Sequence, residues 1–104
     1  MPDVPVYIIA NFEIEDTDTY RKYEKGFFAI LQRHDGTFLT YDDKSITLEG
    51  PDAPPGRLVI FQFPSEDKAL SWYNDPDYQT LSEFRRAGTK LHFITMVHGL
   101  PPRS

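Results

Sequence analysis

The chain contains no cysteine, few basic residues and no long apolar run. The absence of cysteine excludes disulfides, thiolate catalysis and metal sites with sulfur ligands. The 11 lysine and arginine residues are scattered among 16 acidic ones, giving a net charge of −5, whereas nucleic-acid phosphates are bound by a basic stripe. No apolar stretch approaches the roughly 20 residues that span a membrane. We therefore expect no nucleic-acid partner and no membrane segment.

Signals for export, cofactors and metals are also missing. The amino terminus lacks the basic segment of a signal peptide, which together with the missing cysteine predicts a cytoplasmic protein. No glycine-rich phosphate-binding sequence is present, so no nucleotide cofactor is expected. His92 and His98 lie six residues apart on one predicted strand, hence on one face and roughly 20 Å from each other. They cannot share a metal, and we expect neither a metal nor a cofactor.

Aromatic residues, in contrast, are plentiful. The chain has eight Phe, six Tyr and one Trp in 104 residues, a length that predicts a single domain over residues 1–104. A domain of this size buries only roughly two-thirds of the surface that its unfolded chain exposes. The aromatic side chains therefore either fill a small core or also cover a second buried interface.

Hydrophobic periodicity divides the chain into strands and helices. The strands are predicted at residues 6–14, 37–41, 45–49, 57–63 and 91–97. Helices are predicted from residue 17 to about 33, from 66 to 73 and from 76 to 88, with Asp16, Ser65 and Asp75 as their N-caps. Gly36 is expected to end the first helix in the left-handed conformation. Residues 50–56 contain three prolines and predict a surface loop.

Apart from one additional short strand, the order is β-α-β-β-α-β, which predicts a ferredoxin-like α+β fold with an antiparallel sheet. Its helices cover one face of the sheet only. The strands at 57–63 and 91–97 are nevertheless apolar on both faces, a pattern typical of strands that are covered on both sides. A second copy packed sheet to sheet would cover the open face, so we predict a homodimer with twofold symmetry.

The sequence also resembles the DUF1330 family of the dimeric α/β-barrel superfamily, over nearly its whole length. The resemblance rests on the strand and cap RLVIFQFPS, on the helix residues Ala69, Trp72 and Tyr73, and on DPDYQ at 75–79. It implies a ferredoxin-like dimer without an agreed activity. Relatives in the wider superfamily include cofactor-independent monooxygenases, isomerases and haem-binding proteins, which is an analogy at the level of the fold.

Two positions depart from the family pattern. Gln62 stands where the family usually has Glu, and His98 precedes Gly99 where the family often has Glu-Gly. Gln62 cannot carry a proton in place of that Glu. His98 can do so, because the usual histidine pKa lies near 6.5.

The candidate site residues gather near the boundary between helices and sheet. One hypothesis is an aromatic-walled pocket for a small anionic or aromatic metabolite, with Arg85 holding the anion, Gln62 orienting it and His98 as acid or base. Its walls are Tyr20, Trp72, Tyr73 and Tyr78. The alternative is a non-catalytic dimeric module, in which the rings pack the core and Arg85 pairs with a carboxylate such as Glu49. A pocket above roughly 300 Å³ favours the first hypothesis.

Overall fold

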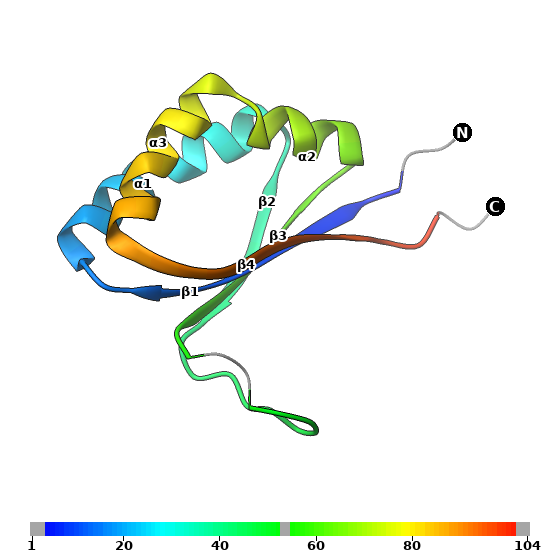
Figure 1. Cartoon of the computed structure of the whole chain (residues 1–104). Helices are drawn as coiled ribbons and strands as arrows, with labels where there is room; N and C mark the ends of the chain where they lie inside the picture. Colours follow the sequence, from blue (N-terminus) through cyan, green and yellow to red (C-terminus); the bar gives the residue numbers. More distant parts are fainter. Residues whose placement is uncertain (1–3, 53–54, 102–104) are drawn as a thin grey trace.

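The computed structural model of the chain describes residues 4–52 and 55–101. In that part, an antiparallel sheet carries helices on one of its faces (Figure 1). The strands, in the spatial order β2-β3-β1-β4, are β1 (Val6–Ile14), β2 (Thr37–Asp42), β3 (Arg57–Phe63) and β4 (Thr89–His98). The helices are α1 (Thr17–Arg33), α2 (Glu66–Tyr73) and α3 (Pro76–Gly88). This is the predicted ferredoxin-like α+β fold, with α2 and α3 together forming the second helical segment.

The helices begin where the sequence predicts. Each of the three N-caps accepts a hydrogen bond from a backbone N–H of the first helical turn, at 2.9–3.2 Å; these caps are Asp16, Ser65 and Asp75. Pro76 occupies the start of α3, where its missing N–H leaves no hydrogen bond unmade. The local signals alone therefore fix the starts of the helices.

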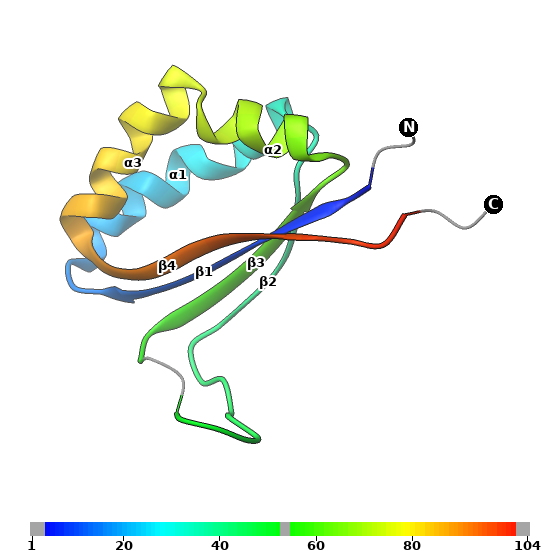
Figure 2. The same cartoon turned by 45° about the vertical axis from the view of Figure 1, so that its right-hand side comes forward.

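The sheet has one face under the helices and one face without them (Figure 2). Alternate residues of β1 are buried against the helices. Ile9 lies between two of these buried residues in the sequence and therefore faces the other side of the sheet. It pairs with Ile60 and Thr95 on the neighbouring strands. Cross-strand partners point to the same side of a sheet. By this register, the helix-free face, which we call the open face, carries the apolar side chains of Tyr7, Ile9, Leu58, Ile60, Phe93 and Val97.

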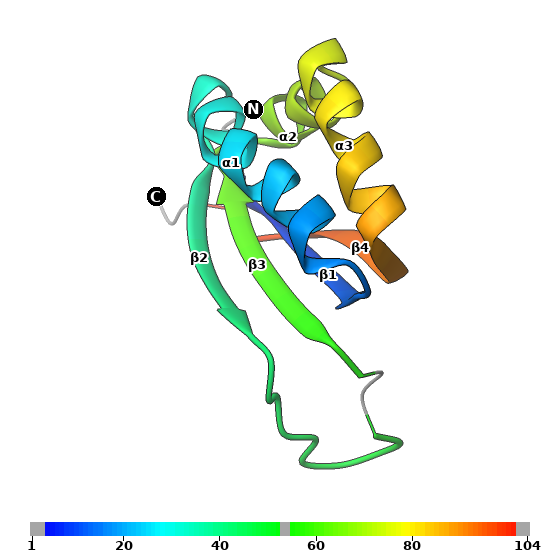
Figure 3. The ribbon, with the colours of Figure 1, turned by 90° about the vertical axis from the view of Figure 1, so that its left-hand side faces the viewer.

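The predicted strand at residues 45–49 is wrong. β2 pairs directly with β3, and the described residues between them, 43–52 and 55–56, extend away from the sheet as an arm (Figure 3). Ile46 and Leu48 on the arm are 83% and 91% exposed. The alternating pattern predicted a strand, but no described strand pairs with this segment. Ala53 and Pro54 of the predicted loop lie outside the described residues.

The end of α1 also differs from the prediction. The residue with a left-handed backbone is Asp35, at φ 62°, and not Gly36. The N–H of Gly36 donates to the carbonyl of Leu31 at 2.9 Å. A Cβ on Gly36 would overlap Leu31 Cδ1 and lie 2.8 Å from Phe63 Cε1. The glycine is therefore needed because the chain passes close to the core, and not for its backbone freedom.

Candidate functional site: a cavity between helices and sheet

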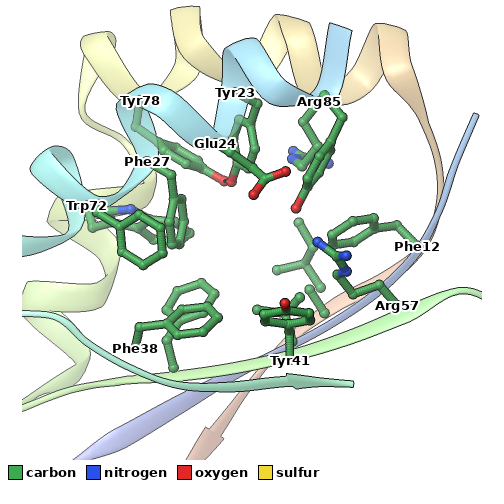
Figure 4. Close-up of a pocket in the computed structure, with 16 residues that line it drawn as sticks. Phe12, Tyr23, Glu24, Phe27, Phe38, Tyr41, Arg57, Trp72, Tyr78 and Arg85 are labelled. Carbon is green, nitrogen blue, oxygen red and sulfur yellow. Dashed lines mark hydrogen bonds between the residues drawn. The ribbon is translucent and has the colours of Figure 1, made fainter. Parts of the chain in front are cut away.

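A cavity lies between the helical layer and the sheet (Figure 4). Its volume is about 90 Å³. One ordered water needs roughly 15 Å³, so the cavity has room for several. Sites for drug-sized ligands begin at roughly 300 Å³. The cavity is therefore a small one, suited to a ligand of about one ring.

Aromatic side chains form most of the cavity wall. They come from the sheet and from all three helices: Phe12, Tyr20, Tyr23, Phe27, Phe28, Phe38, Tyr41, Phe61, Trp72 and Tyr78. The Trp72 and Tyr78 rings have centroids 4.2 Å apart, slightly closer than the range of about 4.5–7 Å that is usual for contacting rings. The indole Nε1 of Trp72 is buried and has no hydrogen-bond partner among the described residues.

Arg85 is the most unusual residue of the wall. It projects from α3, is only 3% exposed and lines the cavity. Its Nε and Nη1 atoms are buried and have no hydrogen-bond partner in the described part of the chain. The guanidinium carbon lies 6.0 Å from the centroid of the Tyr23 ring, the outer limit for a cation–π contact. A buried guanidinium without a carboxylate is costly, so an anion in the cavity would meet an unsatisfied cation.

Two tyrosine hydroxyls meet beside this cation. The hydroxyl oxygens of Tyr23 and Tyr78 lie 2.9 Å apart. Burial raises the pKa of Tyr23 well above its usual range, and the neighbouring Tyr78 adds to the effect. The Tyr23 hydroxyl is thus neutral at physiological pH. Two hydroxyls that share one hydrogen bond leave one proton for a further acceptor, so the pair can donate to a ligand.

A second arginine lines the cavity, from the start of β3. The Arg57 guanidinium carbon lies 4.3 Å from the Tyr41 ring centroid and 5.9 Å from that of Tyr20. Arg57 also donates two hydrogen bonds to Asp43, from Nε at 2.8 Å and from Nη2 at 3.1 Å. Burial raises the pKa of Tyr20 to about 12, although the charges of Arg57 and Arg85 act in the opposite direction. Both cations therefore lie near the neutral Tyr20 hydroxyl.

The structure brings together part of the predicted site. Tyr20, Trp72, Tyr78 and Arg85 line the cavity. Tyr73 is not a lining residue, although its ring contacts those of Trp72 and Tyr78 at centroid distances of 6.0 Å. No salt bridge joins Arg85 to Glu49 among the described residues.

Gln62 and His98 lie elsewhere. Gln62 pairs with Tyr7 and Thr37 across the sheet, which places it on the open face. His98 ends β4, where its Nε2 lies 2.6 Å from Glu66 Oε1 and both side chains are about half exposed. Neither residue lines the cavity. The role predicted for His98 as an acid or base remains a prediction, without a link to Arg85.

Sequence reasoning missed Arg57, Tyr41, Tyr23 and Glu24. Tyr23 follows Tyr20 by about one helical turn, which was a usable signal because such residues share a helix face. Arg57 and Tyr41 come together because β2 and β3 are antiparallel neighbours, and the falsely predicted strand hid that pairing. Glu24 is an exposed residue on α1 and the one carboxylate among the cavity-lining side chains.

The described residues show neither a group of metal ligands nor a helix that could span a membrane. In the described ranges, no three histidine or acidic side chains are grouped so that they could hold a metal ion. His92 instead contacts Glu13 at 3.0 Å, beside a register shift in the β1–β4 pairing that interrupts the simple alternation along β4. Among the same residues, every helix is too short or too polar to cross a membrane.

Comparison with known proteins gives a family and a fold. Residues 5–100 match the family described as a domain of unknown function, DUF1330. No curated protein matches the chain. Among solved structures, RPA0582, a protein of unknown function from Rhodopseudomonas palustris, is 17% identical, with a TM-score of 0.79 and coverage of 96% of this chain and 85% of that one.

Two further structures share the fold at greater distance. SnoaB, a cofactor-independent oxygenase from Streptomyces nogalater, is 13% identical with a TM-score of 0.59, covering 97% of this chain and 96% of that one. A dimeric ferredoxin-like protein of unknown function from Thermobifida fusca is 15% identical with a TM-score of 0.50, covering 93% and 91%. At these identities the likeness establishes the ferredoxin-like fold and no activity.

Proposed function

This chain belongs to the DUF1330 family, which carries no assigned function, and we propose from its own site that it binds a small aromatic carboxylate. The ligand ring packs against the aromatic wall of the cavity, and its carboxylate accepts hydrogen bonds from Arg85. No cofactor takes part. Binding is the part of the small-molecule hypothesis that the cavity supports best, because its lining residues offer ring contacts and hydrogen-bond donors.

The observation that carries this proposal is the state of Arg85. Its Nε and Nη1 are buried without a hydrogen-bond partner among the described residues, and they border a cavity in which aromatic rings predominate. A carboxylate accepts charge-assisted hydrogen bonds from a guanidinium, and either of these nitrogen atoms can donate one. The hydroxyl pair of Tyr23 and Tyr78 can supply a further donor. The wall thus favours an anion attached to a ring over a neutral or cationic molecule.

Benzoate is a suitable probe, because it is one ring with one carboxylate. We expect Arg85→Met to weaken benzoate binding at least tenfold in isothermal titration calorimetry, since hydrogen bonds to charged groups contribute about 1.5–3 kcal/mol. Arg86→Met is the matched control. It removes the same charge from the next residue, which is exposed and donates to Gln79 Oε1 at 2.8 Å, so binding should be unchanged.

Equal affinities in the wild type and in Arg85→Met would contradict the proposal, and so would an equal loss in both variants. The small volume of the cavity, about 90 Å³, favours the second candidate function, a non-catalytic dimeric module whose rings serve as core. Under that alternative, benzoate binds neither the wild type nor Arg85→Met. Circular dichroism of each variant checks that the fold is retained.

We also infer that the protein acts as a homodimer. The open face carries apolar side chains on three strands, Val97 among them at 43% exposure. Pairing of two open faces would remove this surface from water. A distant structural neighbour is described as dimeric, which supports the same assembly. In such a dimer each cavity stays on the outer, helical side of its own sheet.

A further inference from the structure

Arg57 differs from Arg85 in being paired, and its partner lies at the base of the arm. Asp43 is the first residue after β2 and accepts both hydrogen bonds from Arg57. The Arg57 side chain is 18% exposed and that of Asp43 is 52% exposed. The pair therefore sits at the edge of the cavity, with its carboxylate half in water.

The same guanidinium faces the cavity. Figure 4 shows the Arg57 and Arg85 side chains entering the cavity region from the same end, with Arg57 next to Tyr41. Both cations also act on the hydroxyl of Tyr20. Arg57 and Arg85 thus line the same cavity, so a carboxylate held by Arg85 shares that cavity with a second guanidinium, one that already holds a carboxylate of the protein.

We propose that Arg57 is a second anion-binding residue of this site and that Asp43 competes with the ligand for it. This inference rests on the proposed function, because it concerns the same ligand. When the cavity is empty, Asp43 occupies Arg57 and ties the arm to the start of β3. When an aromatic carboxylate binds, the Arg57 guanidinium turns toward it, and Asp43 and the arm are released.

Replacing Asp43 by a ligand carboxylate on Arg57, or the reverse, changes the free energy only modestly. Partly exposed ion pairs contribute little to stability because water solvates the separated charges well. Asp43 has such access to water, and Ile46 and Leu48 further along the arm are almost fully exposed, so few apolar contacts oppose its movement. Arg57 is also held by its contact with the Tyr41 ring, whose centroid lies 4.3 Å from the guanidinium carbon. The competition can therefore tune affinity without disturbing the fold.

Asp43→Asn tests the competition directly. The substitution removes the competing charge, so benzoate should bind this variant up to about fivefold more tightly than the wild type, the equivalent of about 1 kcal/mol. Asp42→Asn is the matched control. Asp42 is also exposed and carries the same charge, but it accepts a hydrogen bond from the Lys44 N–H at 2.7 Å and does not pair with Arg57. Its substitution should leave the affinity close to that of the wild type.

Arg57→Met completes the thermodynamic cycle. This variant should bind benzoate more weakly than the wild type, and adding Asp43→Asn to it should have no further effect, because the two residues act through one contact.

The outcomes separate the two proposals. If benzoate binding depends on Arg85 but Asp43→Asn behaves like Asp42→Asn, the competition is overturned and the ligand site stands. Weaker binding to Asp43→Asn overturns it as well, since Asp43 would then hold Arg57 in place for the ligand. Binding that does not require Arg85 removes the proposed function itself.

Discussion

Arg85 places a positive charge where the protein supplies little to balance it. The side chain is 3% exposed, and two of its nitrogen atoms lack partners within the described ranges. Burying an unpaired charge destabilises a folded protein. Such a residue is understandable where a ligand provides the missing anion, because a binding site can sacrifice stability in the empty state.

Substitution of Arg85 should therefore have opposite effects on the stability of the protein and on ligand binding. Arg85→Met should raise the melting temperature of the ligand-free protein by about 4 °C or more, since methionine fills similar space without a charge and 1 kcal/mol corresponds to about 4–8 °C in a domain of this size. Scanning calorimetry without ligand measures the change. A lower melting temperature than that of Arg86→Met would mean that the guanidinium makes stabilising contacts in the empty protein.

At the scale of elements, local signals predicted the helices well. Caps such as Asp16 and Ser65 act through hydrogen bonds to the next few residues, so a short stretch of sequence contains the information. The strand predicted at 45–49 failed because a strand exists only where another strand pairs with it, and β3 had already taken the position beside β2. Alternation of apolar residues shows that a segment can form a strand, but the strand forms only where a neighbouring strand is free to pair with it.

The N-cap of α3 also joins two helices. The Asp75 carboxylate contacts His34 at 2.8 Å and Arg33 at 3.0 Å, at the end of α1, while it accepts the N–H of Asp77. The hydrogen bond with His34, then that with the Asp77 N–H, holds the pKa of Asp75 below its usual value. A lowered pKa in the folded state contributes stability that is present above the unfolded pKa, near 3.8, and is lost as the pH falls through the folded value.

Asp75→Asn isolates this charge, because asparagine caps a helix about as well as aspartate. The wild type should lose more stability than the variant between pH 7 and pH 3. Urea unfolding at the two pH values measures both losses. The free energies of unfolding of the two proteins should approach each other at pH 3, where the carboxylate is becoming protonated. A parallel loss in both proteins would show that Asp75 does not couple folding to pH.

At the scale of the molecule, the cavity was only partly predictable. The sequence identified Arg85, Tyr20 and Trp72 as neighbours because the fold places their helices over one sheet face. It could not identify Arg57, whose position depends on which strand pairs with β2. Gln62 was assigned to the site although it alternates with the buried Phe61 and Phe63, and this alternation, applied strictly, already places it on the open face.

The open face gives the prediction for the assembly. Val97→Lys places a charge on that face and should shift the protein from dimer to monomer in native mass spectrometry. Leu70→Lys is the matched control, because Leu70 has the same 43% exposure but lies on α2, in the helical layer. The Leu70→Lys variant should remain dimeric. A monomeric wild type, or a Val97→Lys variant that stays dimeric, would mean that the open face does not form the interface.

The central claim, that Arg85 binds a carboxylate inside the cavity, is tested most directly by NMR of the arginine Nε–H groups during a titration with benzoate. The Arg85 signal can be assigned by its loss in Arg85→Met. We predict that this signal moves downfield and saturates with the same dissociation constant as the calorimetric titration, while the Arg86 signal stays in place. An Arg85 signal that is unaffected at saturating benzoate would contradict the claim.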